Sequence, residues 1–242
     1  MNVELFIPCF IDQIYPETAF NTVKLLEKAG CIVDYNPEQT CCGQPAYNAG
    51  FWDEAKKTGS QFLNVFSEDK YIVAPSASCV SMVKGGYDDL FTNSIEHNRC
   101  RNIQQNMYEL SDFLVNIAKK EYFGAELIGT AVYHDSCSAL RECHLREEPR
   151  RLLNQVGGLS LVEMEDGETC CGFGGTFAVK FEGISVAMAE QKVKRAMDLQ
   201  ADYIISTDSS CLLQMQAYID KHQLPIKTKH LADVLTSGWA NI

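Results

Sequence analysis

Short apolar runs, each closed by turn-forming or polar residues, recur along the chain and predict buried β-strands. Each run is four to six residues long, which suits a strand that is covered on both faces. The predicted strands occupy residues 3–8, 31–35, 71–74, 131–134, 159–164 and 203–206.

Between these runs, apolar residues return at intervals of three and four, the spacing of an amphipathic helix. We expect helices over residues 16–29, 51–66, 107–120 and 184–200. The first of them opens with Pro16 and closes at Gly30, the usual asymmetry of helix ends. Residues 224–238 add one more short strand and a final helix.

The alternation of strand and helix predicts parallel sheets with covering helices. Because the alternation occurs twice, the expected fold class is α/β with two pseudo-symmetric repeats. Each repeat is a small parallel sheet with covering helices and with cysteines at the C-terminal ends of the strands. We expect the first repeat to span residues 1–125 and the second residues 126–242, with a linker inside the polar stretch 91–129.

Four cysteines recur in the same order in each repeat. The first of each set ends a strand-like run, an adjacent pair followed by glycine comes next, and the last ends another strand-like run. The offsets between matching cysteines are 128, 129, 129 and 132 residues. The two sets are Cys9, Cys41, Cys42 and Cys79 in the first repeat and Cys137, Cys170, Cys171 and Cys211 in the second.

Each set of four is expected to converge at one edge of its sheet, because ligands bind beyond the carboxyl ends of parallel strands. The glycine after each cysteine pair permits a tight, left-handed turn, so that both sulfurs can face one object. Adjacent cysteines chelate a single small ion poorly, whereas an iron–sulfur cluster offers separate irons to neighbouring thiolates. The residues therefore favour an iron–sulfur site, with zinc and a thiol or disulfide redox site as alternatives.

The composition limits the compartment and the partners that we expect for this protein. The chain carries eleven cysteines in 242 residues, and its start lacks the pattern of a signal peptide. We expect a cytoplasmic protein, where clustered thiols indicate metal or redox chemistry rather than disulfides. A net charge of −11 argues against a nucleic-acid partner, and no apolar run is long enough to span a membrane.

The chain resembles the CCG, or cysteine-rich domain, family, and within it the lactate utilization A group. The resemblance covers essentially the whole chain and is carried by the segments "FIPCF", "TCCGQPAYNAG", "ETCCGFGGTFAVK" and "HLADVL". The family also includes the cysteine-rich subunit of heterodisulfide reductase and the iron–sulfur subunits of glycolate oxidase and anaerobic glycerol-3-phosphate dehydrogenase. The last two carry a ferredoxin-type cysteine segment that this sequence lacks, which favours the lactate utilization group.

The resemblance implies an iron–sulfur electron-transfer subunit of a cytoplasmic complex that oxidises L-lactate to pyruvate. It implies one or two clusters per chain, [4Fe–4S] in type, held by the eight cysteines of the two sets. Two other subunits would be its partners, one of them with ferredoxin-type clusters, and the chain would be a non-autonomous part of the oxidoreductase. Two alternatives stay open: a thiol or disulfide redox enzyme like heterodisulfide reductase, and a zinc-stabilised interaction module.

The sequence departs from the fuller family pattern at one position in each repeat. The family often has a fifth cysteine there, which in heterodisulfide reductase helps to hold a non-cubane cluster. Here the positions are Ser76 and Asp208, so that each site has four thiols. An oxygen ligand is one role for these residues, but we expect them to cap the following helix.

Four further polar residues lie near the cysteine sets along the chain without being part of the repeated pattern. We expect His134 to hydrogen-bond within the sheet, with a place near the site, as proton donor or ligand, as the alternative. We expect Asp135, Arg141 and Lys84 on the solvated surface rather than beside a cluster.

Overall fold

The computed structural model describes residues 1–92, 96–165 and 167–239. The chain divides into two compact units, Met1–Ala118 and Lys119–Ile242. Each unit contains one four-stranded sheet whose strands are all parallel. The strand orders are β2-β1-β3-β4 and β6-β5-β7-β8, which is the same topology twice. The predicted α/β fold with two pseudo-symmetric repeats is therefore confirmed.

The first sheet is built from short strands whose central members are buried. Its strands are β1 (Asn2–Leu5), β2 (Ile32–Asp34), β3 (Tyr71–Ala74) and β4 (Met107–Glu109). Its helices are α1 (Cys9–Ile14), α2 (Pro16–Lys28), α3 (Gln44–Asn48), α4 (Trp52–Val65), α5 (Ala77–Ser81), α6 (Tyr87–Leu90), α7 (Glu96–Asn106) and α8 (Leu110–Asp112), with π-helical turns η1 (Met82–Gly86) and η2 (Phe113–Ile117).

The second sheet repeats this plan with longer outer strands. Its strands are β5 (Glu126–Tyr133), β6 (Gly157–Val162), β7 (Tyr203–Ser206) and β8 (Lys227–His230). Its helices are α9 (Glu147–Leu153), α10 (Thr176–Lys180), α11 (Glu182–Asp198), α12 (Ser209–His222) and α13 (Leu231–Leu235), with the π-helical turn η3 (Ser138–Glu142).

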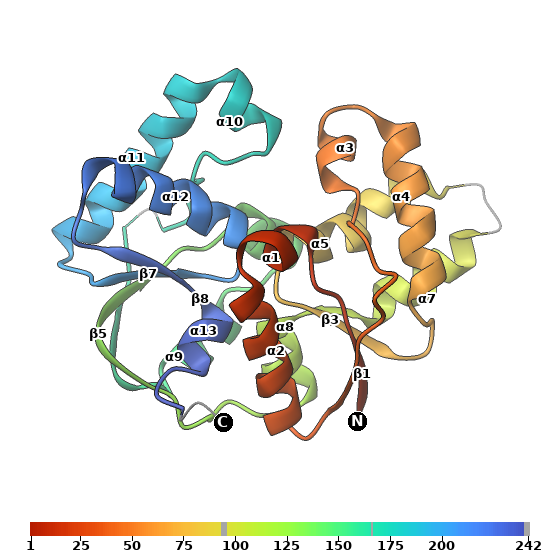
Figure 1. Cartoon of the computed structure of the whole chain (residues 1–242), viewed down its shortest axis with the longest axis horizontal. Coiled ribbons are helices and arrows are strands. Elements are labelled where there is room, and N and C mark those ends of the chain that lie inside the picture. Colours follow the sequence, from red (N-terminus) through yellow and green to blue (C-terminus); the bar gives the residue numbers. More distant parts are fainter. Residues whose placement is uncertain (93–95, 166, 240–242) are drawn as a thin grey trace. The chain divides into compact units, whose positions relative to one another are not determined.

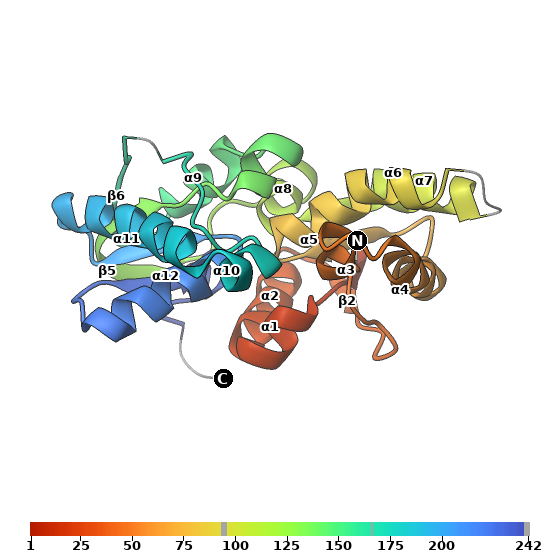
Figure 2. The same ribbon diagram turned by 90° about the horizontal axis from the view of Figure 1, so that it is seen from above.

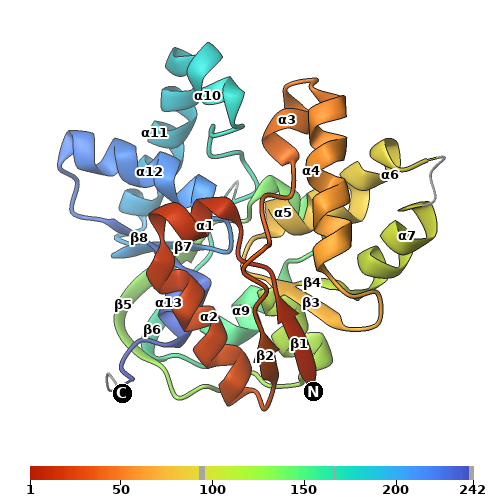
Figure 3. The same ribbon diagram turned by 45° about the vertical axis from the view of Figure 1, so that its right-hand side comes forward.

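Helices cover both faces of each sheet, as right-handed crossovers between parallel strands require. In the first unit α2 lies on one face and α4 and α7 on the other (Figures 1 and 3). In the second unit α9 and α13 pack together on one face, and α11 and α12 run side by side on the other (Figures 1 and 2). Each set of four cysteines thereby belongs to a single sheet and its helices.

The predicted strands coincide with β1, β2, β3, β6 and β7 to within three residues at each end, and the tail supplies β8 and α13. The prediction for β5 found only its C-terminal half, because the strand begins at Glu126, five residues before the predicted start. The prediction of one helix over residues 107–120 was wrong. Met107, Tyr108 and Glu109 form the edge strand β4, which pairs with β3, and only the residues after it are helical. The pairing partner of these three residues, rather than their own pattern, decides their conformation.

An aromatic cluster forms the core of the first unit between its sheet and α4. Phe6, just past the end of β1, meets Phe62 edge-to-face at 4.9 Å and Phe66 at 5.7 Å. Such perpendicular ring pairs add roughly 0.5–1.5 kcal/mol to the gain from burial alone. No helix in the described part of the chain is long and apolar enough to cross a membrane.

Glu109 ends β4 and caps α8 from an almost fully buried position. Its Oε2 accepts hydrogen bonds from the backbone N–H groups of Ser111 at 2.7 Å and Asp112 at 3.3 Å, whereas its buried Oε1 has no partner. Burial is the main cause that raises the pKa of this carboxyl from 4.5 to about 8. The folded state therefore binds the proton more tightly than the unfolded chain does.

We expect this carboxyl to make the protein less stable as the pH rises. Because the folded pKa lies above the unfolded one, its contribution is fully present below about pH 4.5 and is lost up to about pH 8. Between pH 5 and pH 7 the Glu109 carboxyl should lower the free energy of unfolding of the wild type by roughly 2–3 kcal/mol. The Glu109→Gln variant, which has no carboxyl at this position, should not show this decline. Urea unfolding of the full chain at both pH values measures the difference, with Glu27→Gln on the exposed face of α2 as the control. Equal slopes in the wild type and Glu109→Gln would contradict the argument.

Candidate metal centres

The topology brings the four cysteines of each set to the carboxyl edge of one sheet. We call Cys9, Cys41, Cys42 and Cys79 the first site, and Cys137, Cys170, Cys171 and Cys211 the second site. Cys9 opens α1 after β1, and Cys79 lies in α5 directly after β3. Cys137 follows β5 and precedes η3, while Cys211 lies in the first turn of α12 after β7.

The sulfurs of the first site form a continuous chain of contacts. The Cys9 thiol donates to Cys41 Sγ at 3.6 Å, and the Cys42 thiol contacts both Cys41 and Cys79. Hydrogen bonds from Cys42 and Cys9, together with the backbone N–H of Gly43, lower the pKa of the Cys41 thiol to about 3. The hydrogen bond to Cys41 and burial raise the pKa of Cys9 above the range of a free thiol. One thiolate thus sits at the centre of the site.

The second site repeats this chain sulfur for sulfur. Cys170 accepts hydrogen bonds from Cys137 and Cys171, and the backbone N–H of Gly172 donates to its Sγ at 3.3 Å. These contacts lower the pKa of Cys170 to about 2. Cys171 contacts Cys170 and Cys211, and the pKa of its thiol is raised by those hydrogen bonds and by burial. In both cysteine pairs the second thiol is buried and the first is partly accessible.

Only glycine suits the position after each cysteine pair, because the backbone there is left-handed and a side chain would collide with the neighbouring helix. Gly43 and Gly172 have φ angles of +86° and +88°, in the left-handed region that side chains disfavour. A Cβ at Gly43 would lie 3.1 Å from the carbonyl oxygen of Ala55, and one at Gly172 would lie 2.5 Å from that of Ser185. The sequence prediction of a left-handed turn at both glycines is confirmed.

Replacing Gly172 by alanine is expected to destabilise the second unit by roughly 2–3 kcal/mol. A left-handed alanine costs on the order of 1–2 kcal/mol, and the contact with the Ser185 carbonyl adds to it because backbone atoms cannot rotate away. Denaturant unfolding measures the loss. Gly183→Ala, also in the second unit, is the control, since a Cβ there meets nothing within 4 Å. A Gly172→Ala variant as stable as Gly183→Ala would contradict the expected strain.

His134 follows β5 and lies beside the second site, so the expectation of a hydrogen bond within the sheet is wrong for its side chain. The imidazole is fully buried, and neither ring nitrogen has a hydrogen-bond partner. A ring nitrogen and the sulfurs of Cys171 and Cys211 all lie within 4.8 Å of one another. Burial lowers the pKa of His134 to about 3, which keeps the ring neutral.

Asp135 is buried rather than solvated, contrary to the prediction. Arg150 on α9 forms a two-pronged ion pair with it, Nη1 to Oδ1 at 2.9 Å and Nη2 to Oδ2 at 2.8 Å. The same guanidinium also binds Glu163 and lies over the ring of Tyr133. Arg141 and Lys84 are exposed, as predicted. The ion pair anchors the segment between β5 and Cys137 to α9.

Ser76 and Asp208 occupy the N-cap positions of α5 and α12, but neither side chain makes the capping hydrogen bond that we predicted. Asp208 instead accepts a hydrogen bond from the hydroxyl of Ser136 at 2.7 Å. Ser76 Oγ lies 3.2 Å from Ser78 Oγ. Asp208 therefore links the segment before Cys137 to the segment before Cys211.

A cavity of about 470 Å³ adjoins the second site on the side of Asp135 and Thr169. Three arginines and three acidic residues line it, and two of the arginines are ion-paired within it. The lining therefore carries equal numbers of positive and negative side chains. It is lined by Asp135, Arg141, Arg146, Arg150, Glu163, Met164, Gly167, Glu168 and Thr169.

The donor atoms of both sites fit a metal centre. Each offers four cysteine sulfurs that contact one another in a chain, and a backbone N–H donates to the second sulfur of that chain. Four thiolates match the ligands of a [4Fe–4S] cluster, and they also match a tetrahedral zinc ion. Many cysteines in this arrangement favour metal or iron–sulfur binding over a purely structural role.

Comparison with known proteins agrees with this arrangement. The family model for the cysteine-rich domain, CCG, matches residues 3–84 and 131–216, one match in each unit. A solved structure, that of a hypothetical protein from Helicobacter pylori, has the same fold with a TM-score of 0.60 at 11% sequence identity. The superposition covers 99% of this chain and 49% of the Helicobacter protein, so the chain spans about half the length of that structure.

Curated relatives match nearly the whole chain. "Lactate utilization protein A" of Geobacillus kaustophilus is 42% identical over 238 residues, which is 98% of this chain and 99% of the relative. "Lactate utilization protein A 2" of Bacillus cereus is 39% identical over 239 residues, again 98% and 99% of the two lengths. The chain therefore belongs to the cysteine-rich CCG domain family and, within it, to the lactate utilization protein A family.

Proposed function

We propose that the chain is the iron–sulfur electron-transfer subunit of a complex that oxidises L-lactate to pyruvate. The observation that carries the proposal is the chain of four contacting cysteine sulfurs at the carboxyl edge of the sheet in each unit. The names of the relatives supply the substrate. The eight cysteines of the two sites would be the ligands of one or two clusters, [4Fe–4S] in type.

The chemistry required of such a subunit is electron transfer without bond making. Oxidation of lactate to pyruvate releases two electrons and two protons, and a bound iron–sulfur cluster accepts and passes on one electron at a time. This chain's own residues hold the thiolates and shield them. Cys42 and Cys171 are buried, and the N–H groups of Gly43 and Gly172 donate to thiolate sulfurs, an interaction that raises a cluster's reduction potential.

The substrate itself is proposed to react on a partner subunit. Iron–sulfur clusters exchange single electrons and do not by themselves take up a hydride, so another cofactor, carried by a partner, is proposed for that step. We propose two partner subunits, one of them with ferredoxin-type clusters, and a cytoplasmic location for the complex.

Anaerobic purification followed by analysis of iron, sulfide and zinc tests the cofactor. The expected result is a brown protein with about four irons and four sulfides per loaded site and little zinc. A colourless protein with stoichiometric zinc would overturn the proposal in favour of a zinc-stabilised module. Reduction of the bound clusters by lactate, in the presence of the partner subunits and not without them, tests the pathway.

A further inference from the structure

The two sites are not chemically equivalent. Two positions that hold aromatic residues in the first unit hold buried polar residues in the second. His134 and Phe6 occupy matching positions: the backbone N–H of Phe6 donates to the Val73 carbonyl on β3, and that of His134 donates to the Ile205 carbonyl on β7. Each residue is therefore the first after the strand that leads to the cysteine set.

The partner of each residue on the covering helix also matches. The glycine of each cysteine pair faces the same two helix positions, Ala55 and Thr58 on α4 and Ser185 and Met188 on α11. Continued along both helices, this alignment sets Lys192 at the position of Phe62. The buried positions of the two helices agree with it at every step, since α4 buries residues 55, 59, 62 and 63 and α11 buries 185, 189, 192 and 193.

The first unit fills these two positions with the edge-to-face pair of Phe6 and Phe62. The second unit fills them with two residues that are costly to bury. Lys192 is anchored by a hydrogen bond of 2.7 Å from its Nζ to the Gly167 carbonyl, on the loop before Cys170. His134 has no such partner at either nitrogen. A fully buried imidazole without a hydrogen-bond partner is unusual, and a bound metal would account for it at this position.

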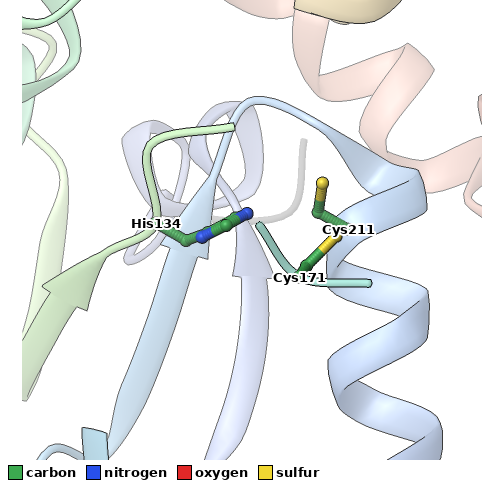
Figure 4. A group of neighbouring side chains, drawn as sticks. All are labelled: His134, Cys171 and Cys211. Atoms are coloured by element: carbon green, nitrogen blue, oxygen red, sulfur yellow. The ribbon is translucent and has the colours of Figure 1, made fainter. Parts of the chain in front are cut away.

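The direction of the His134 side chain indicates where such a metal would lie. Figure 4 shows the imidazole directed from the end of β5 toward Cys171 and Cys211, with all three residues around one point. Ligand atoms of a tetrahedral zinc or iron are roughly 3.6 Å apart, so the three atoms, which lie within 4.8 Å of one another, are at most about 1 Å too far apart to share an ion.

We propose that His134 is a nitrogen ligand of the metal or cluster at the second site, which makes that site a mixed sulfur and nitrogen centre. Because a [4Fe–4S] cluster takes one protein ligand on each of its four irons, His134 would take the place of one of the four thiolates there. The first site, with Phe6 at the matching position, is an all-sulfur centre. A neutral imidazole offers one nitrogen lone pair to a metal, and borderline-soft ions such as zinc and iron accept sulfur and nitrogen ligands together. The inference rests on the proposed function only for the identity of the metal.

Pulsed electron paramagnetic resonance of the full chain, loaded anaerobically with iron and sulfide and then reduced, tests the ligand. The Cys41→Ser background weakens the first site, so that the second dominates the spectrum. We expect a nitrogen coupling that changes when the protein is labelled with ¹⁵N-histidine. The coupling should be lost in His134→Phe and kept in His230→Gln, because both nitrogens of His230 are already hydrogen-bonded. No histidine coupling in a loaded wild-type site would overturn the proposal.

Cobalt(II) binding to the apo-protein provides a test that does not depend on cluster assembly. Its absorption bands report sulfur and nitrogen ligands, and His134→Phe is expected to weaken binding at the second site by about tenfold or more. Phe6→Leu is the matched control at the first site and should leave cobalt affinity unchanged. If the protein takes up no iron, the proposed function fails, and this titration still decides the ligand: equal affinity in folded His134→Phe and wild type overturns the inference.

Discussion

Replacing Cys41 by serine is expected to remove the metal of the first site and to leave that of the second. Cys41 is the central sulfur of its chain, in contact with Cys9 and Cys42 and with the Gly43 N–H. A serine hydroxyl does not ionise near neutral pH, so the substitution removes the thiolate that the other donors surround. Iron and sulfide per chain should fall to about half of the wild-type value when both sites are loaded.

Cys170→Ser is the equivalent substitution in the second site and should remove the iron and sulfide of that site. Cys31→Ser is the matched control, because Cys31 is buried and lies outside both sulfur chains, and its metal content should equal that of the wild type. Iron and sulfide analysis of the three anaerobically purified variants measures the effect. Full metal content in Cys41→Ser, or loss of both centres from one substitution, would rule out two independent four-cysteine sites.

The strand framework was readable from the sequence because parallel strands buried on both faces appear as unbroken apolar runs. The runs at β3 and β7 matched the observed strands residue for residue. The edge strand β4 was not readable, since three residues followed by a helix carry no strand pattern of their own. Pairing of Met107 with Ile72 on β3 makes those residues a strand.

The eight cysteines could also be placed from the sequence, because the repeat fixed their order and parallel topology fixed their edge. The neighbours of the second site could not. Asp135 was expected in solvent, yet it is buried, and the reason is Arg150, fifteen residues further along on another element. Lys192 was hidden in the apolar side of α11, where Ala189 and Val193 set the pattern. A residue-by-residue alignment of the two repeats places Lys192 opposite Phe62.

The surroundings of the two sites differ in polarity. In the first unit Phe6 and Phe62 are in edge-to-face contact at the positions that His134 and Lys192 hold in the second. The second unit also holds buried polar side chains near its site through specific partners, as Ser136 binds Asp208 and Arg150 binds Asp135. A polar surround is retained at a cost in stability, so we expect the second unit to depend on its individual interactions more than the first.

The strongest dependence is expected at Arg150, whose replacement by methionine should lower the free energy of unfolding of the apo-protein by about 3–5 kcal/mol. The guanidinium side chain is 10% exposed and the Asp135 carboxylate 3% exposed, so removal of the arginine leaves a buried charge without its two-pronged partner. Loss of the contact with the Tyr133 ring, 5.2 Å from the guanidinium, adds to the effect.

Two variants separate this buried pair from a general effect of lost charge. Arg146→Met removes the pair with Glu168, in which both side chains are 55% exposed, and should cost no more than about 1 kcal/mol because water screens that pair. Arg150→Met combined with Asp135→Ile, the residue that Ile7 supplies at the matching position of the first unit, should recover most of the loss, since no buried charge then remains. Urea unfolding of the full chain under reducing conditions measures all four proteins. If Arg150→Met were no less stable than Arg146→Met, or the double variant no more stable than Arg150→Met, the buried charge would not be the cause.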